Sequence, residues 1–114
     1  MLKSLPEIVA EISPNVNLLD AKTALHQCQQ NNGKIVDVRE PAEVDQHPVK
    51  HSVNIPRGIL EVKIGSLCPN ANDAIYIHCA SGGRAVLASE QLQRMGYTNV
   101  TAITCKVADI IALN

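Results

Sequence analysis

Residues 75–85, IYIHCASGGRA, are the stretch that decides the fold. Residues 74–79 form a short, mostly apolar run, which predicts a buried strand. Two glycines follow this run and predict a tight loop, and residues 84–95 carry an apolar stripe with helical spacing. Gly96 is expected to end that helix. The stretch therefore predicts a strand, a loop and a helix, with Cys79 where the strand ends.

The same signals recur along the rest of the chain. Further strands are expected at residues 16–19, 34–38, 52–55 and 100–103. Further helices are expected at residues 3–12, 41–46, 59–67 (with an interruption at Gly65) and 106–113, and between a cap at Asp20 and a stop at 31–33. Strands that alternate with helices are typical of an α/β fold, in which a parallel sheet carries helices on both faces. We expect one domain over residues 1–114, with its core at about 13–112.

The composition sets limits on the core and on the partners. Hydrophobic residues make up 46% of the 114 residues, but aromatic residues only 2%, with no Phe and no Trp, so the core must be aliphatic. The net charge of −1 provides no basic field for nucleic acid or for anionic lipid. No apolar run suits a secretory signal or a membrane span, so a cytoplasmic protein is expected. A monomer is the default expectation for its oligomeric state.

Four cysteines occupy positions 28, 68, 79 and 105. They form no CxxC pair and no paired Cys/His spacing, which argues against a zinc site and against a disulfide scaffold. Cys28 lies on an apolar helix stripe, where packing explains it. Cys79 is the cysteine whose surroundings predict chemistry.

The loop after Cys79 combines several features that stabilise an anion. Ligands bind at the carboxyl edge of open α/β sheets, where Cys79 is expected to lie. The backbone N–H groups of the loop can form an anion-binding nest, and the helix dipole adds partial positive charge. The nest and the dipole both favour a nucleophilic thiolate at Cys79. Gly82 and Gly83 permit close approach, and Arg84 can supply a forked donor to an oxyanion. The alternative is a buried structural cysteine beside a solvated arginine.

Several segments of the sequence, in the same order along the chain, resemble the rhodanese family. CASGGR at residues 79–84 resembles the family's six-residue active-site loop, and DVRE at 37–40 resembles its upstream signature. Residues 51–56 (HSVNIP) and 96–100 (GYTNV) are similar to two further family segments in the same order. The resemblance spans about residues 13–112. It implies a rhodanese-like fold with a central, mainly parallel five-stranded sheet and helices on both faces.

The resemblance also implies a thiosulfate sulfurtransferase. Cys79 would attack the outer sulfur of a donor such as thiosulfate, and a thiophilic acceptor, either cyanide or a thiol, would then remove that sulfur in a ping-pong scheme. The amides of Ala80, Ser81, Gly82, Gly83 and Arg84 would surround the persulfide. A small anionic donor and a possible protein acceptor are the implied partners, and no metal or organic cofactor is implied.

Two departures from the family pattern concern the far end of the chain. A glycine pair that the family often has after its last strand is replaced by Cys105 and Lys106, and the tryptophan of its final helix by approximately Ile110. Cys105 could therefore act as a resolving thiol for the Cys79 persulfide, although a small residue at a strand end is the simpler interpretation. The other supporting residues, Asp37 and Arg39, are expected to form a structural ion pair.

Two rival functions remain open. Cysteine phosphatases and arsenate reductases use a similar loop, but theirs has the spacing C-x5-R, whereas Cys79 and Arg84 have C-x4-R, which suits sulfur better than a tetrahedral phosphate. A non-catalytic rhodanese-like interaction module is the second rival. Retention of Cys79 and the loop glycines argues against it.

Overall fold

The computed structural model describes residues 1–113. Its helices are α1 (Leu5–Ile12), α2 (Ala21–Asn31), α3 (Pro41–Gln46), α4 (Leu60–Leu67), α5 (Gly83–Met95) and α6 (Val107–Ala112). Its strands are β1 (Asn17–Leu19), β2 (Lys34–Asp37), β3 (Ser52–Asn54), β4 (Ile75–His78) and β5 (Val100–Ile103). Two 3-10 turns that were not predicted, η1 (Ser13–Asn15) and η2 (Arg57–Ile59), connect α1 to β1 and β3 to α4. Every predicted strand and helix is present, and its ends lie within two residues of the expected bounds.

The five strands form one parallel sheet in the order β1-β5-β4-β2-β3. Strands β4 and β5 are buried along their whole length, whereas β1 and β3 at the two edges are more exposed. A strand buried on both faces reads as a continuous apolar run, as residues 74–79 do. The predicted α/β class and the parallel five-stranded sheet are confirmed.

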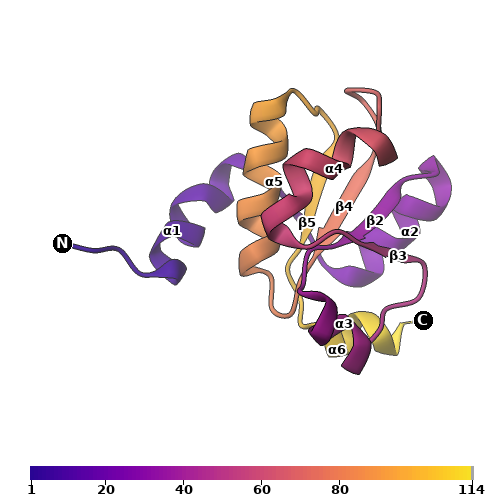
Figure 1. Cartoon of the computed structure of the whole chain (residues 1–114), viewed down its shortest axis with the longest axis horizontal. Helices are drawn as coiled ribbons and strands as arrows, with labels where there is room; N and C mark the ends of the chain where they lie inside the picture. The colour runs from indigo at the N-terminus through magenta and orange to yellow at the C-terminus, as the bar shows by residue number, and fades with distance from the viewer. Residues whose placement is uncertain (114) are drawn as a thin grey trace.

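Helices cover both faces of the sheet and divide the core into two clusters (Figure 1). On one face, α4 and α5 pack over Val36 and Ile77, and α1 packs against α5. On the other face, α2 and α6 pack over Ile35, Tyr76 and Ile103. Because neighbouring strand residues point to opposite faces, His78 and Cys79 also point to opposite faces.

The helix ends follow local chemistry that the sequence displays. The Asp20 carboxylate accepts a hydrogen bond from the Thr23 N–H at 2.9 Å and caps α2. Gly96, with φ of 108°, ends α5 as predicted. The expected interruption at Gly65 is wrong, because α4 runs through it without a break. One glycine costs a helix only about 1 kcal/mol, and burial of Leu60 and Ile64 in the core outweighs that cost.

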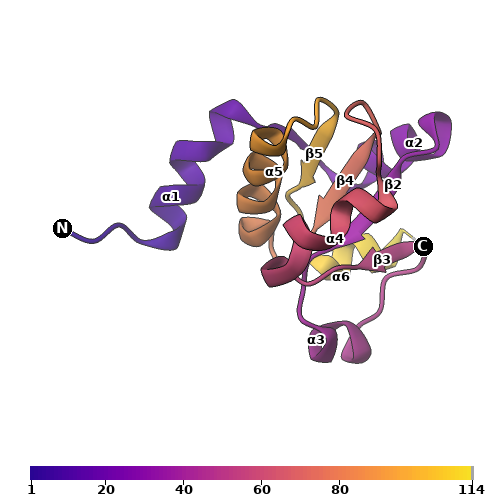
Figure 2. The same cartoon turned by 45° about the horizontal axis from the view of Figure 1, so that its top comes forward.

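Helix α1 extends away from the body of the molecule at the N-terminal end (Figures 1 and 2). It has no fully buried residue, but Val9 and Ile12 are partly buried against the core. Leu5 and Val9 also lie near Gly83, where an added Cβ would be 3.9 Å from each side chain. Within residues 1–113, no helix has the length and apolar character needed to cross a membrane.

Candidate active site

The site lies at the carboxyl edge of the sheet, where the strand register places several chemical groups side by side. Asp37 at the end of β2 is in register with Asn54 of β3 and with His78 of β4. Cys79 follows His78 directly, and the loop 80–82 then leads into α5. The parallel topology therefore brings together segments far apart in the sequence.

The Cys79 sulfur accepts hydrogen bonds from the start of α5. The Gly82 N–H donates to Sγ at 3.1 Å and the Ala85 N–H at 3.4 Å. N–H groups in the first turn of a helix have no partner within the helix, and they carry its partial positive charge. They can therefore stabilise a negatively charged sulfur.

The loop that carries these donors is held against its surroundings. Gly82 has φ of 105°, and a Cβ at this position would lie 3.1 Å from the Thr104 carbonyl oxygen. The Ala80 carbonyl accepts a hydrogen bond from the Val107 N–H at 2.9 Å, which ties the loop to α6. Ser81 is exposed and Gly83 half-buried. Among the described residues, Gly82 and Ala85 supply the N–H bonds to Sγ, and Ala80, Ser81, Gly83 and Arg84 shape the loop around them.

Cys79 itself is 1% exposed and belongs to the core cluster on the α4 and α5 face. Its sulfur is thus solvated by two N–H groups rather than by water. The N–H groups lie on the loop side of the sulfur, and the core cluster on this face is largely aliphatic.

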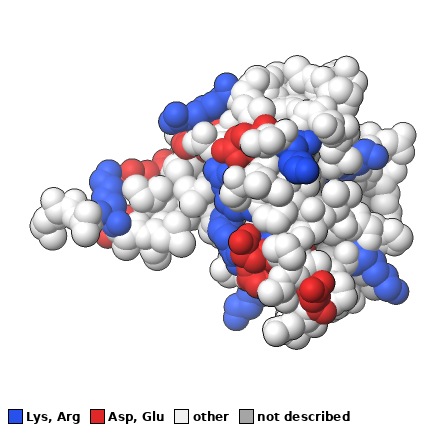
Figure 3. Space-filling model, viewed as in Figure 1, with Lys and Arg blue, Asp and Glu red and all other residues white. Residues whose placement is uncertain are grey.

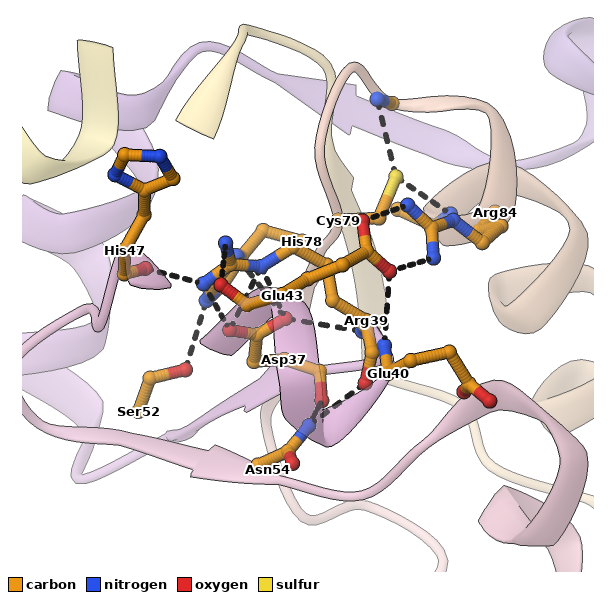
Figure 4. Close-up of polar contacts among 12 residues, drawn as sticks. Asp37, Arg39, Glu40, Glu43, His47, Ser52, Asn54, His78, Cys79 and Arg84 are labelled. Carbon is orange, nitrogen blue, oxygen red and sulfur yellow. Dashed lines mark hydrogen bonds and ion pairs between the residues drawn. The ribbon is translucent and has the colours of Figure 1, made fainter. Parts of the chain in front are cut away.

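Arg84 does not point freely into solvent or over the sulfur. Its Nη1 donates to Oε1 of Glu43 at 2.6 Å and its Nη2 to Oε2 at 2.9 Å, so the guanidinium and the carboxylate are paired through two bonds (Figure 4). Hydrogen bonds from Arg84 hold the pKa of Glu43 at about 2, and the carboxylate in turn raises the pKa of Arg84. The expected forked donor is present, but the Glu43 carboxylate already accepts two of its hydrogen bonds.

Asp37 and Arg39 form the predicted structural ion pair, and both are buried. Arg39 Nε and Nη2 donate to the Asp37 carboxylate, and Nη2 also donates to the His47 carbonyl at 2.8 Å. The Asn54 side-chain amide donates to the Asp37 and Arg39 carbonyls, each at 2.9 Å. These bonds fix α3, and with it Glu43, beside the loop.

His78 is fully buried on the face opposite Cys79. Its Nε2 lies 2.7 Å from the Ser52 hydroxyl, while its Nδ1 has no hydrogen-bond partner in the described part of the chain and lies 3.9 Å from Asp37 Oδ1. Burial lowers the pKa of His78, although the Asp37 carboxylate acts in the opposite direction. A neutral imidazole that shares a hydrogen bond with the Ser52 hydroxyl fits this buried position.

Cys105 is half-buried and packs against the cluster on the α2 and α6 face, across the sheet from the cluster of Cys79. All four cysteines are free thiols. Burial raises the pKa of Cys28 and of Cys68, which opposes thiolate formation at both. No group of three or more His, Cys, Asp or Glu side chains within residues 1–113 is arranged to hold a metal ion.

Two groups at the site, the Ala85 N–H and the Glu43 carboxylate, are not indicated by the sequence pattern. Ala85 lies one residue beyond the six-residue loop, and it contributes through a backbone N–H that any residue other than proline would have. Glu43 lies 41 positions before Arg84, and nothing in its local pattern points to the loop. Glu43 lies in the first turn of α3, three residues after the DVRE segment, and neither fact indicates a contact with Arg84.

The chain resembles known proteins in sequence and in fold. The sequence profile of the Rhodanese-like domain family matches residues 18–105. The chain is 35% identical over 65 residues to the thiosulfate sulfurtransferase PspE of Escherichia coli K12, a match that covers 57% of this chain and 62% of PspE.

Two solved structures show the same fold. A rhodanese with anions from E. coli is 31% identical and superposes with a TM-score of 0.62, covering 65% of this chain and 87% of that one. A Rhodopseudomonas palustris protein of unknown function, described as a possible tyrosine phosphatase, has a TM-score of 0.80 at 24% identity, covering 99% and 92%. With the profile match over residues 18–105, these findings establish that the chain belongs to the Rhodanese-like domain family.

Proposed function

We propose that the protein is a sulfurtransferase that carries sulfane sulfur as a persulfide on Cys79. The Cys79 thiolate attacks the outer sulfur of a donor such as thiosulfate, the S–S bond of the donor breaks, and sulfite leaves with the electron pair. A thiolate or cyanide then attacks the outer sulfur of the persulfide and releases the Cys79 thiolate. The two half-reactions form a ping-pong cycle.

The observation that carries this proposal is the pair of N–H bonds from Gly82 and Ala85 to the Cys79 sulfur at the start of α5. They stabilise both the attacking thiolate and the thiolate that leaves in the second half-reaction. The backbone donates these bonds, so the stabilisation requires no other side chain. The names of relatives such as PspE support sulfur transfer as the reaction class.

The deep position of Cys79 adds a requirement. Because the residue is 1% exposed, the loop 80–82 or the first turn of α5 has to move slightly for a donor to reach the sulfur. A small donor and a small acceptor suit this access best. Cys105 as a resolving thiol, a monomeric state, a protein acceptor and a cytoplasmic location remain predictions.

Steady-state sulfur transfer tests the proposal. Wild type and Cys79→Ser are assayed with thiosulfate as donor and with cyanide and several thiols as acceptors, and Cys68→Ser serves as the matched control. We expect Cys79→Ser to lose turnover with every acceptor, while Cys68→Ser retains it. Equal turnover by wild type and Cys79→Ser would overturn the proposal.

The phosphatase alternative is tested with a chromogenic aryl phosphate under the same conditions. The C-x4-R spacing favours a single sulfur atom over a tetrahedral phosphate, so wild type is expected to leave the aryl phosphate intact. Cys79-dependent phosphate release without sulfur transfer would assign the loop to phosphate chemistry instead.

A further inference from the structure

The arginine beside the loop is already bound to an anion of the protein itself. Arg84 and Glu43 share two hydrogen bonds, and their side chains are 33% and 38% exposed, so the pair lies at the surface beside the loop (Figure 4). A doubly charged donor that seeks the guanidinium has to displace the carboxylate or share the guanidinium with it. Displacement of the carboxylate and sharing of the guanidinium both cost free energy. A donor with less charge depends less on the guanidinium and avoids most of this cost.

Glu43 is fixed in this position by more than Arg84. The Glu40 backbone N–H donates to Glu43 Oε1 at 3.0 Å, and Arg39 Nη1 reaches the Glu43 carbonyl at 3.4 Å. The pKa of about 2 keeps the Glu43 carboxylate charged at any ordinary assay pH. A competing anion can therefore release Arg84, whereas a change of pH near neutrality cannot.

Arg39 cannot replace Arg84 as a group that binds an anionic donor. The Arg39 guanidinium is buried and points at the Asp37 carboxylate. At the loop, the positive charge of Arg84 is cancelled by Glu43 and that of Arg39 by Asp37. The thiolate of Cys79 is then left with neutral N–H donors as its nearest support.

We propose that Glu43 is a specificity-determining residue that disfavours doubly charged sulfur donors such as thiosulfate and favours donors whose leaving group carries at most one charge, such as thiol persulfides. This inference rests on the proposed function of Cys79. With a persulfide RSSH, the Cys79 thiolate attacks the outer sulfur, the S–S bond breaks and RS⁻ leaves with the electron pair. The proton stays on the transferred sulfur, and no dianion forms beside Glu43.

The test measures kcat/KM for loading of Cys79 with two donors, thiosulfate and the persulfide of 2-mercaptoethanol, which has no carboxylate. Three proteins are compared: wild type, Glu43→Gln and Glu40→Gln. The glutamine at position 43 keeps an acceptor for the Glu40 N–H and removes only the charge. Glu40 acts on the Arg84 guanidinium through its charge and makes no hydrogen bond to it in the described part of the chain, so Glu40→Gln tests the loss of a nearby charge without loss of the direct pair.

We expect Glu43→Gln to raise kcat/KM for thiosulfate roughly fivefold, the scale of a partly exposed ion pair, and to leave the value for the persulfide within about twofold. Glu40→Gln should leave both values near those of wild type. In an Arg84→Gln background the gain from Glu43→Gln should vanish, because the guanidinium is what Glu43 competes for. Sulfite should also inhibit Glu43→Gln more strongly than wild type.

The outcomes separate this inference from the function on which it rests. If neither donor loads Cys79 in wild type, both the proposed function and the inference fail. If both donors load it and Glu43→Gln changes the two values by the same factor, or changes neither, the function stands and the inference is overturned. If Glu43→Gln unfolds, Glu43→Ala takes its place in the same comparison, with the same expected result and the same contradicting result.

Discussion

Asp37 and Arg39 bring two opposite charges into the interior of a small domain, where both side chains are almost fully buried. Removal of one partner from such a pair costs about 3–5 kcal/mol, because the other charge is left without compensation. We expect Asp37→Asn to lower the free energy of unfolding, measured in urea, by about that amount. The exposed pair Lys3–Glu11 provides the control, since Glu11→Gln should cost less than about 1 kcal/mol. A similar small loss for both variants would contradict a structural role for the buried pair.

His78 predicts a dependence of stability on pH. Burial lowers its pKa in the folded protein below the ordinary 6.5. Below about pH 6.5 the unfolded chain takes up a proton that the folded protein does not, so stability falls as the pH falls. The slope is at most about 1.4 kcal/mol per pH unit for one group.

The measurement is urea unfolding between pH 7 and pH 5. Glu43, with its pKa at about 2 in the folded protein and an ordinary value of 4.5, contributes little to the change in this window. We expect His78→Gln to unfold with a smaller slope against pH than wild type, whereas the exposed His26→Gln provides the control for the loss of a histidine. An unchanged slope in His78→Gln would show that the buried imidazole is not the source.

At the scale of the element, the loop before α5 depends on a glycine for two separate reasons. Gly82 and Gly96 have nearly the same φ, 105° and 108°, but only Gly82 lies against another segment, the Thr104 backbone. Gly96→Ala should therefore cost about 1–2 kcal/mol for its backbone conformation alone. Gly82→Ala should cost about 1 kcal/mol or more in addition, because its Cβ would overlap the Thr104 carbonyl.

Thermal unfolding and sulfur transfer together check this prediction. Gly82→Ala should also slow loading of Cys79, since a displaced loop moves the Gly82 N–H away from the sulfur. Gly96→Ala should leave loading unchanged. Equal losses of stability and equal loading rates for the two variants would mean that contact with Thr104 has no consequence.

The elements of this fold were predictable because their signals are local. Asp20 caps α2, Gly96 ends α5 and the apolar run at residues 74–79 forms the buried β4, all as the sequence suggests. Gly65 does not interrupt α4, because a glycine weakens a helix only slightly, while the tertiary contacts of Leu60 and Ile64 stabilise it.

The site was predictable in part, for the same reason. Cys79, Gly82 and Arg84 lie within six residues of one another, so their proximity follows from the sequence. The partner of Arg84 does not, because Glu43 reaches it only through the strand order, which places β2 and α3 beside β4 and its loop. Pairing that depends on topology leaves no trace in the spacing of neighbouring residues.

At the scale of the whole molecule, neither positive nor negative charge dominates the surface. The net charge is −1, and on the face seen in Figure 3 basic and acidic side chains are interspersed. Recognition of a donor must therefore come from the loop and its immediate neighbours rather than from a long-range field. The sheet supplies the scaffold by aligning the ends of β2, β3 and β4 at one edge.

The central claim is that the start of α5 holds a reactive sulfur on Cys79. Its most direct test is intact-mass spectrometry with peptide mapping after incubation with a sulfane-sulfur donor and removal of the excess. We predict a gain of one sulfur atom on Cys79 of the wild-type protein, unmodified thiols at the other three cysteines, and no gain in Cys79→Ser. Added sulfur on a different cysteine, or the same gain in Cys79→Ser, would contradict the account.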